Sequence, residues 1–71
     1  MRVRVSDPRC LDDLEVFLET TLAAVHERIA SDEIEVSPLG SLNEDAAAMA
    51  LDLQLRAWES ANPGLRAERR P

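Results

Sequence analysis

The sequence predicts a single α+β domain with the element order β-α-β-β-α-β. Three observations indicate this order. Short stretches near both ends and in the middle alternate between apolar and polar residues, as half-buried strands do. Two longer stretches repeat apolar residues at three- and four-residue steps, as amphipathic helices do. Residues that favour turns, mainly proline, glycine, serine and asparagine, separate these stretches.

The first strand is predicted over residues 1–5, where two valines alternate with two arginines. Asp7 followed by Pro8 ends this strand and is typical of a helix N-cap with proline in the first turn. The first helix is predicted from Cys10 to about Leu22, with Phe17 on the flank of its apolar stripe. The stripe consists of leucines, namely Leu11, Leu14, Leu18 and Leu22.

The end of the first helix has two interpretations. Val25 and Ile29 continue the apolar spacing, so one long first helix reaching Ala30 is an alternative, with the order β-α-β-α. Such a helix is about 30 Å long, whereas strands of four or five residues span only about 15 Å. We favour a strand over residues 23–30 that forms a hairpin with a strand over 33–36, because two helix-weakening threonines precede it.

The second helix is predicted to begin near residue 43. Ser41 and Glu44 have the spacing of a capping box, and Asn43 is a rival N-cap. The helix runs to about Ala61, where an Asn-Pro-Gly sequence stops it. Its central apolar stripe is Ala47, Leu51, Leu55 and Trp58.

A last short strand is predicted over residues 65–68, which alternate again. Residues 69–71 are expected to form a frayed tail, so the single domain spans residues 1–68. This element order is that of ferredoxin-like domains, in which two helices cover one face of an antiparallel sheet. The open face is predicted to carry charges of both signs and no aromatic residue, namely Arg2, Arg4, His26, Arg28, Glu33, Glu35, Arg66 and Glu68.

Composition limits the classes of partner. The chain has 71 residues and a formal net charge of −6, which repels nucleic acid and anionic lipid, so neither is expected as a partner. A single cysteine excludes an intrachain disulfide, and the N-terminus lacks the apolar stretch of a signal peptide. We therefore expect a cytoplasmic protein without a membrane span. The short chain has few aromatic residues, so a homodimer interface is expected to support its small core.

The sequence predicts no catalytic, cofactor-binding or metal site. Cys10 stands alone among acidic neighbours, and His26 is distant from it in sequence, so neither a metal site nor an activated thiol is indicated. The two glycines, Gly40 and Gly64, each serve a turn and do not form a phosphate-binding loop. We expect a protein that is not an enzyme and needs no cofactor.

The chain resembles a group of short, uncharacterised bacterial proteins of actinobacterial type. The resemblance rests on residues 3–8 (Val-Arg-Val-Ser-Asp-Pro), 32–36 (Asp-Glu-Ile-Glu-Val), 55–58 (Leu-Arg-Ala-Trp) and 62–64 (Asn-Pro-Gly). These proteins have a glycine between the first helix and the hairpin, whereas residues 20–24 contain none here. The resemblance implies an α+β fold and no particular activity.

The leading hypothesis is an interaction module that binds a second copy of itself or another protein. Met49 and Leu53 lie one turn apart, outside the main stripe of the second helix. Together with Arg2, Arg4 and Arg28 of the open sheet face, they are the candidate interface residues. A small-molecule-sensing domain or a minor enzyme subunit, using a cleft beside the sheet, is the alternative.

Overall fold

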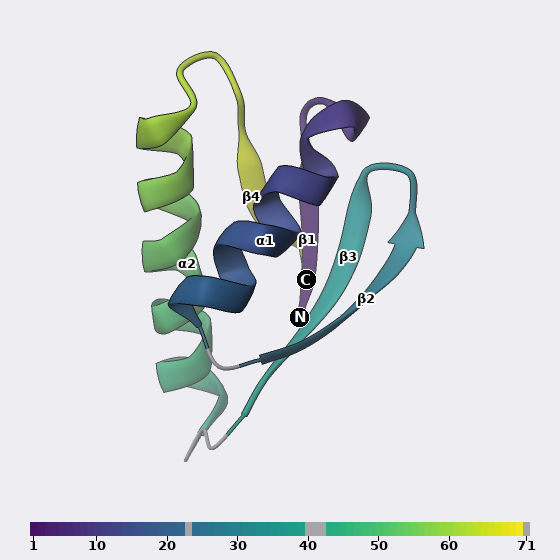
Figure 1. Cartoon of the computed structure of the whole chain (residues 1–71). Helices are drawn as coiled ribbons and strands as arrows, with labels where there is room; N and C mark the ends of the chain where they lie inside the picture. The colour runs from purple at the N-terminus through teal and green to yellow at the C-terminus, as the bar shows by residue number, and fades with distance from the viewer. Residues whose placement is uncertain (23, 40–42, 71) are drawn as a thin grey trace.

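The computed structural model describes residues 1–22, 24–39 and 43–70, and within them a four-stranded antiparallel sheet carries two α-helices (Figure 1). The sheet order is β2-β3-β1-β4. The α+β class predicted from the sequence is confirmed. In chain order the elements are β1 (Arg2–Val5), the 3₁₀ turn η1 (Pro8–Cys10), α1 (Leu11–Thr21), β2 (Ala24–Ala30), β3 (Glu33–Pro38), α2 (Glu44–Ala61) and β4 (Ala67–Arg70).

The one long first helix is not formed, because α1 ends at Thr21 and the chain is a strand again from Ala24. Leu22 is extended, with its N–H donating to Leu18 O at 2.9 Å. The hydroxyls of Thr20 and Thr21 donate to Phe17 O at 2.9 and 2.8 Å. The helix thus ends without glycine. Both threonine hydroxyls bind a carbonyl of the preceding turn, which weakens the end of the helix, and the chain leaves it in the extended conformation of Leu22.

The core lies between the two helices and the central strands. The stripe of the second helix is buried as predicted. Of the predicted first stripe, Leu11, Leu14 and Leu18 are buried on α1, whereas Leu22 is half-buried and lies beyond the helix end. From the sheet, alternate residues of β1 and β3 enter the same apolar cluster: Val3, Val5, Ile34 and Val36. The period-two prediction for the first strand is therefore confirmed, with both valines buried and both arginines exposed.

At the helix starts, one predicted cap differs and one of the two rival caps is confirmed. The Asp7 carboxylate accepts a hydrogen bond from Arg9 N at 3.0 Å, so Asp7 caps the 3₁₀ turn and not the α-helix itself. Asn43 caps α2, its Oδ1 accepting from Ala46 N at 2.7 Å. The rival capping residue Ser41 lies outside the described residues.

The last strand has the predicted length of four residues but begins two residues later than predicted. β4 spans Ala67–Arg70, where the sequence analysis expected a strand over 65–68 and a frayed tail over 69–71. Pairing with β1 explains the shift, because Val5 lies opposite Ala67 and Arg2 opposite Arg70. Pro71 lies outside the described residues.

The turn before β4 sets where that strand begins. Asn62 O accepts from Leu65 N at 3.0 Å, with Pro63 and Gly64 between them. Gly64 has φ +90°, the conformation that the third residue of a type II turn requires and that side-chain-bearing residues rarely adopt. This turn occupies residues 62–65, so pairing with β1 starts beyond it.

Trp58 is the largest fully buried side chain, with 1% of its surface exposed. Its indole Nε1–H donates to the Asp13 carboxylate of α1 at 2.9 Å. The bond joins the two helices and satisfies the one polar atom of this side chain.

Removal of this acceptor should destabilise the protein. We expect Asp13→Ala to lower the free energy of unfolding by about 1–2 kcal/mol, because the buried indole N–H loses its partner. Asp13→Asn keeps an acceptor oxygen at the same place and should lose less than half as much stability as Asp13→Ala, as measured by urea unfolding followed by Trp58 fluorescence. Equal losses in the two variants would show that the charge near the helix start, and not the hydrogen bond, is what matters.

Candidate functional site

The structure corrects the predicted open face of the sheet at β2. His26 and Arg28 were expected on that face, but they lie opposite the buried residues Val36 and Ile34 and therefore point to the helix side. The apolar residues of the strand, Val25 and Ile29, are instead 57% and 44% exposed. Arg28 is therefore separated from the other candidate interface residues of the sheet.

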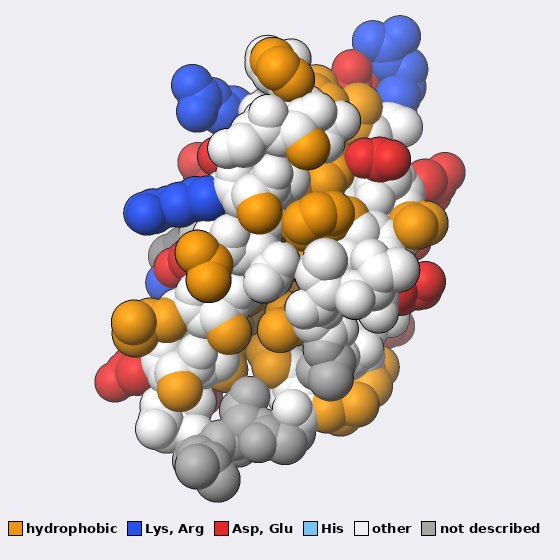
Figure 2. Space-filling model, turned by 60° about the vertical axis from the view of Figure 1, so that its left-hand side comes forward, with side chains coloured by type: hydrophobic (Ala, Val, Ile, Leu, Met, Phe, Trp, Pro, Cys, Tyr) orange, Lys and Arg blue, Asp and Glu red, His pale blue; other side chains and the backbone are white. Residues whose placement is uncertain are grey.

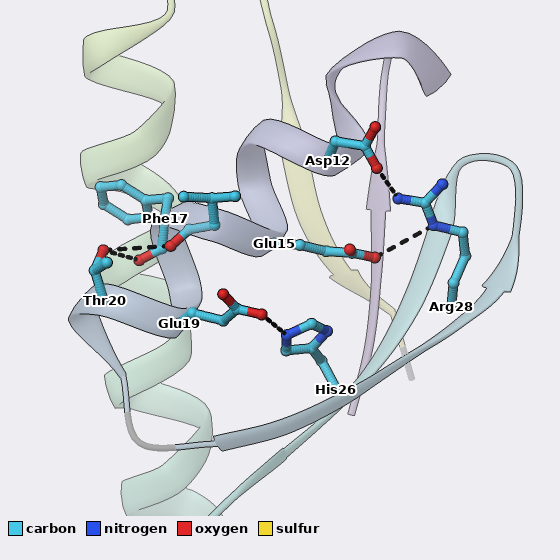
Figure 3. A network of polar contacts seen from close by, with 8 residues as sticks. Asp12, Glu15, Phe17, Glu19, Thr20, His26 and Arg28 are labelled. Carbon is cyan, nitrogen blue, oxygen red and sulfur yellow. Dashed lines mark hydrogen bonds and ion pairs between the residues drawn. The ribbon is translucent and has the colours of Figure 1, made fainter.

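Acidic residues of α1 explain this orientation (Figure 3). The Arg28 guanidinium binds the Asp12 carboxylate, and its Nε donates to Glu15 Oε1 at 3.3 Å. His26 Nε2 lies 2.9 Å from Glu19 Oε1. These three carboxylates point from one face of α1 toward β2, so the sheet presents its cationic side chains to them.

The network keeps Arg28 charged and occupied. Its hydrogen bonds raise the pKa of the guanidinium above its ordinary value, and the bond to Asp12 contributes more to this rise than the bond to Glu15. β2 lies at one edge of the sheet, and a register shift between Arg28 and Ala30 interrupts its pairing with β3. Inward-pointing charges and bulges are both devices that protect an edge strand from pairing with other chains.

The open face consists mainly of opposed charges on the central strands. Arg2 lies opposite Glu35, and Arg4 lies between Glu33 and Glu68. The Arg4 guanidinium donates to the Asp32 carboxylate at 3.0 Å. Arg4 therefore lies between two carboxylates, whereas Arg2 lies between Glu35 and Arg70. The central strands thus carry charges of both signs on this face, as the sequence predicts.

A shallow depression of about 310 Å³ lies at one end of this face. Its lining is predominantly charged: Arg4, Val5, Ser6, Asp32, Arg66, Glu68 and Arg70. Three guanidinium groups and two carboxylates thus surround one surface hollow.

The face of α2 opposite its buried stripe carries two neighbouring exposed apolar residues. Met49 and Leu53 are 72% and 65% exposed, one turn apart on the side of the helix opposite the buried stripe. Figure 2, in which α2 comes forward, shows hydrophobic side chains spread along this helix. The two residues also line a depression of about 410 Å³ with Ala50, Asp52 and Arg56.

The candidate interface residues therefore form two separate surfaces. Met49 and Leu53 lie on α2, Arg2 and Arg4 lie on the open sheet face, and Arg28 belongs to neither. The sequence analysis missed further exposed members of the α2 face, Asp45, Ala46, Arg56 and Ala57. The helical period of 3.6 residues was the signal that could have found them.

Cys10 is half-buried and packs against the core. Across residues 1–22, 24–39 and 43–70, no cluster of three or more His, Cys, Asp or Glu side chains is arranged to hold a metal ion. Neither described helix is long and apolar enough to cross a membrane.

Comparison with known proteins identifies no relative: no protein-family model, curated protein or solved structure matches the chain.

If the inward-pointing Arg28 protects the β2 edge, its replacement should promote aggregation. We expect Arg28→Val to change the free energy of unfolding only slightly, because the ion pairs of Arg28 are exposed. The same variant should form thioflavin-T-positive aggregates sooner than the parent under agitation, because the edge then carries three exposed β-branched residues. Arg4→Val is the matched control, since Arg4 also makes an exposed ion pair but lies on a central strand. Equal aggregation of the two variants would contradict a specific role for the edge.

Proposed function

We propose that this chain is a non-enzymatic protein-interaction module of the cytoplasm, which binds its partner through the outer face of α2. The observation that carries the proposal is the exposed pair Met49 and Leu53. Both side chains project from the helix whose opposite face is anchored in the core by four buried residues. The partner thus meets apolar groups held on a rigid element.

The distribution of the other exposed apolar residues supports this choice. Val16 lies on α1, Val25 and Ile29 lie on the protected edge strand, and Leu39 follows β3. Only Met49 and Leu53 of the described large apolar side chains form an exposed pair one helical turn apart. Adjacent exposed apolar groups flanked by charges are typical of a protein-binding surface.

The proposal includes a ferredoxin-like arrangement of the domain. Its support is the position of β1 and β3 at the centre of the sheet, with each helix connecting a central strand to an edge strand. In that arrangement both helices pack on one side, and the outer face of the second helix stays available to a partner. The resemblance to short bacterial proteins agrees with this proposal, in which no catalytic site is required.

Site-specific photo-crosslinking in the source cells tests the interaction surface. A photoreactive phenylalanine analogue at position 49 should give a covalent adduct on irradiation, because the partner covers this face. The same analogue at Val16, which is 59% exposed on α1, is the matched control and should give none. Leu53→Asp in the position-49 variant should abolish the adduct, because a buried unpaired carboxylate opposes binding. Absence of an adduct at 49, or equal adducts at 49 and 16, would overturn the proposal.

Small-molecule sensing is a second candidate, favoured by the depression on the open sheet face. Its three arginines suit a small ligand that carries a carboxylate or phosphate group. A panel of anionic metabolites should then raise the melting temperature of the parent protein but not that of Arg66→Gln, because ligand binding stabilises the folded state. If no member of the panel shifts the parent, this candidate fails.

A further inference from the structure

On the outer face of α2, opposite the buried stripe, exposed residues of related chemistry are arranged in pairs about one midpoint. At about 100° per residue, the positions that lie farthest from the buried stripe form one face of the helix. All of its members are exposed: Asp45, Ala46, Met49, Leu53, Arg56, Ala57 and Ser60. Apart from Ser60, they fall into three pairs of matched chemistry.

The three pairs share nearly the same midpoint along the helix. Met49 and Leu53 are centred on position 51. The charged pair, Asp45 and Arg56, is centred on 50.5 and lies along one border of the face. The small pair, Ala46 and Ala57, is centred on 51.5 and lies along the other border.

A common midpoint is what a two-fold axis requires. When two copies of one helix pack antiparallel about such an axis, each residue faces the residue equally far beyond the midpoint on its partner. This axis also places each border of the face against the same border of the second copy. Asp45 therefore meets Arg56 of the second copy, and Ala46 meets Ala57 of the second copy.

We infer that the partner of this face is a second copy of the chain, packed antiparallel through α2. This inference rests on the proposed function and names its partner. Met49 and Leu53 of both copies form the apolar centre, and the alanine border lets the two helix backbones approach closely. Two symmetry-related Asp45–Arg56 ion pairs close the other border.

The charges of the single chain support this pairing. Within the described part of the chain, neither Asp45 nor Arg56 makes an ion pair, whereas the neighbouring Asp52 is already bound to Arg69 at 3.0 Å. Opposite charges remain at matched places on the outer face, and the two-fold packing brings them together. A parallel two-fold packing places the border that carries Asp45 and Arg56 against the alanine border of the second copy. These charges then stay unpaired, which disfavours that alternative.

The edge of β2 is less suited to self-association. Antiparallel pairing of two copies centred on Glu27 opposes two carboxylates, and pairing centred on Arg28 opposes two guanidinium groups. The register shift between Arg28 and Ala30 further interrupts a continuous ladder. The α2 face has no such conflict.

Sedimentation equilibrium of the purified chain, from about 10 µM to 1 mM, tests the inference. A single helix pair is a small interface, so we expect a reversible monomer–dimer equilibrium with a Kd of about 10⁻⁵ to 10⁻³ M. Leu53→Asp should raise the Kd more than about tenfold, since two carboxylates enter the apolar centre. Val16→Asp, an equally exposed apolar residue on α1, should leave the Kd unchanged.

Charge exchange tests the antiparallel geometry. Asp45→Arg and Arg56→Asp should each raise the Kd by about tenfold, because each single change opposes like charges at both ends of the interface. The double variant, with both changes, restores opposite charges and should return the Kd to within about twofold of the parent. Circular dichroism verifies that each variant is folded.

The outcomes separate this inference from the proposed function. A parent chain that stays monomeric at 1 mM overturns the inference, while a crosslinked adduct with a different protein at position 49 still supports the interaction module. A dimer whose double charge variant remains as weak as the single variants overturns the antiparallel arrangement. Rescue by the double variant supports both the partner and its orientation.

Discussion

The packing of two leucine-rich helical stripes against the central strands is the interaction on which the rest of the structure depends. Only twelve buried apolar residues are available among the described residues, and most belong to β1, β3 and the two helices. A 71-residue chain buries little surface, so this cluster has to be continuous. Apolar burial then fixes the centre of the sheet, acts on β4 through Ala67 alone, and leaves the orientation of β2 to other forces.

The two edge strands show what those forces are. On β2, His26 and Arg28 face the acidic side of α1 and leave Val25 exposed, because the core does not extend over this strand. On β4, Arg69 reaches toward α2 and donates to Asp52 at 3.0 Å. Ion pairs to α1 therefore orient β2, whereas on β4 the ion pair adds to the burial of Ala67 on the same face. Such exposed pairs contribute little energy each, but where apolar burial does not choose a face they are sufficient to decide it.

This division explains which features could be predicted from the sequence. The helical stripes, the first strand and the central pair of strands follow from apolar periodicity, because burial enforces that periodicity. The orientation of β2 could not be predicted in this way, since its apolar residues lie outside the core and its pattern favours the opposite face. The start of β4 depended on backbone pairing with β1, and no local signal distinguishes residues 65–68 from Ala67–Arg70. For the candidate site, the spacing of residues alone placed Met49 and Leu53 outside the buried stripe. The size of the exposed face around them could be determined only from the exposure of the neighbouring residues in the structure.

The same core supports the role that we propose for α2 as a binding element. Four buried residues hold its inner face, and the Trp58–Asp13 hydrogen bond fixes it against α1. The outer face is therefore ordered before any partner arrives, and association costs only the ordering of a few exposed side chains. An interface of one helix on a rigid domain can thus be small and still form. The apolar side chains at the centre of this interface add to a core that is limited by chain length, so self-association would also stabilise the fold. The free energy of unfolding would then increase with protein concentration.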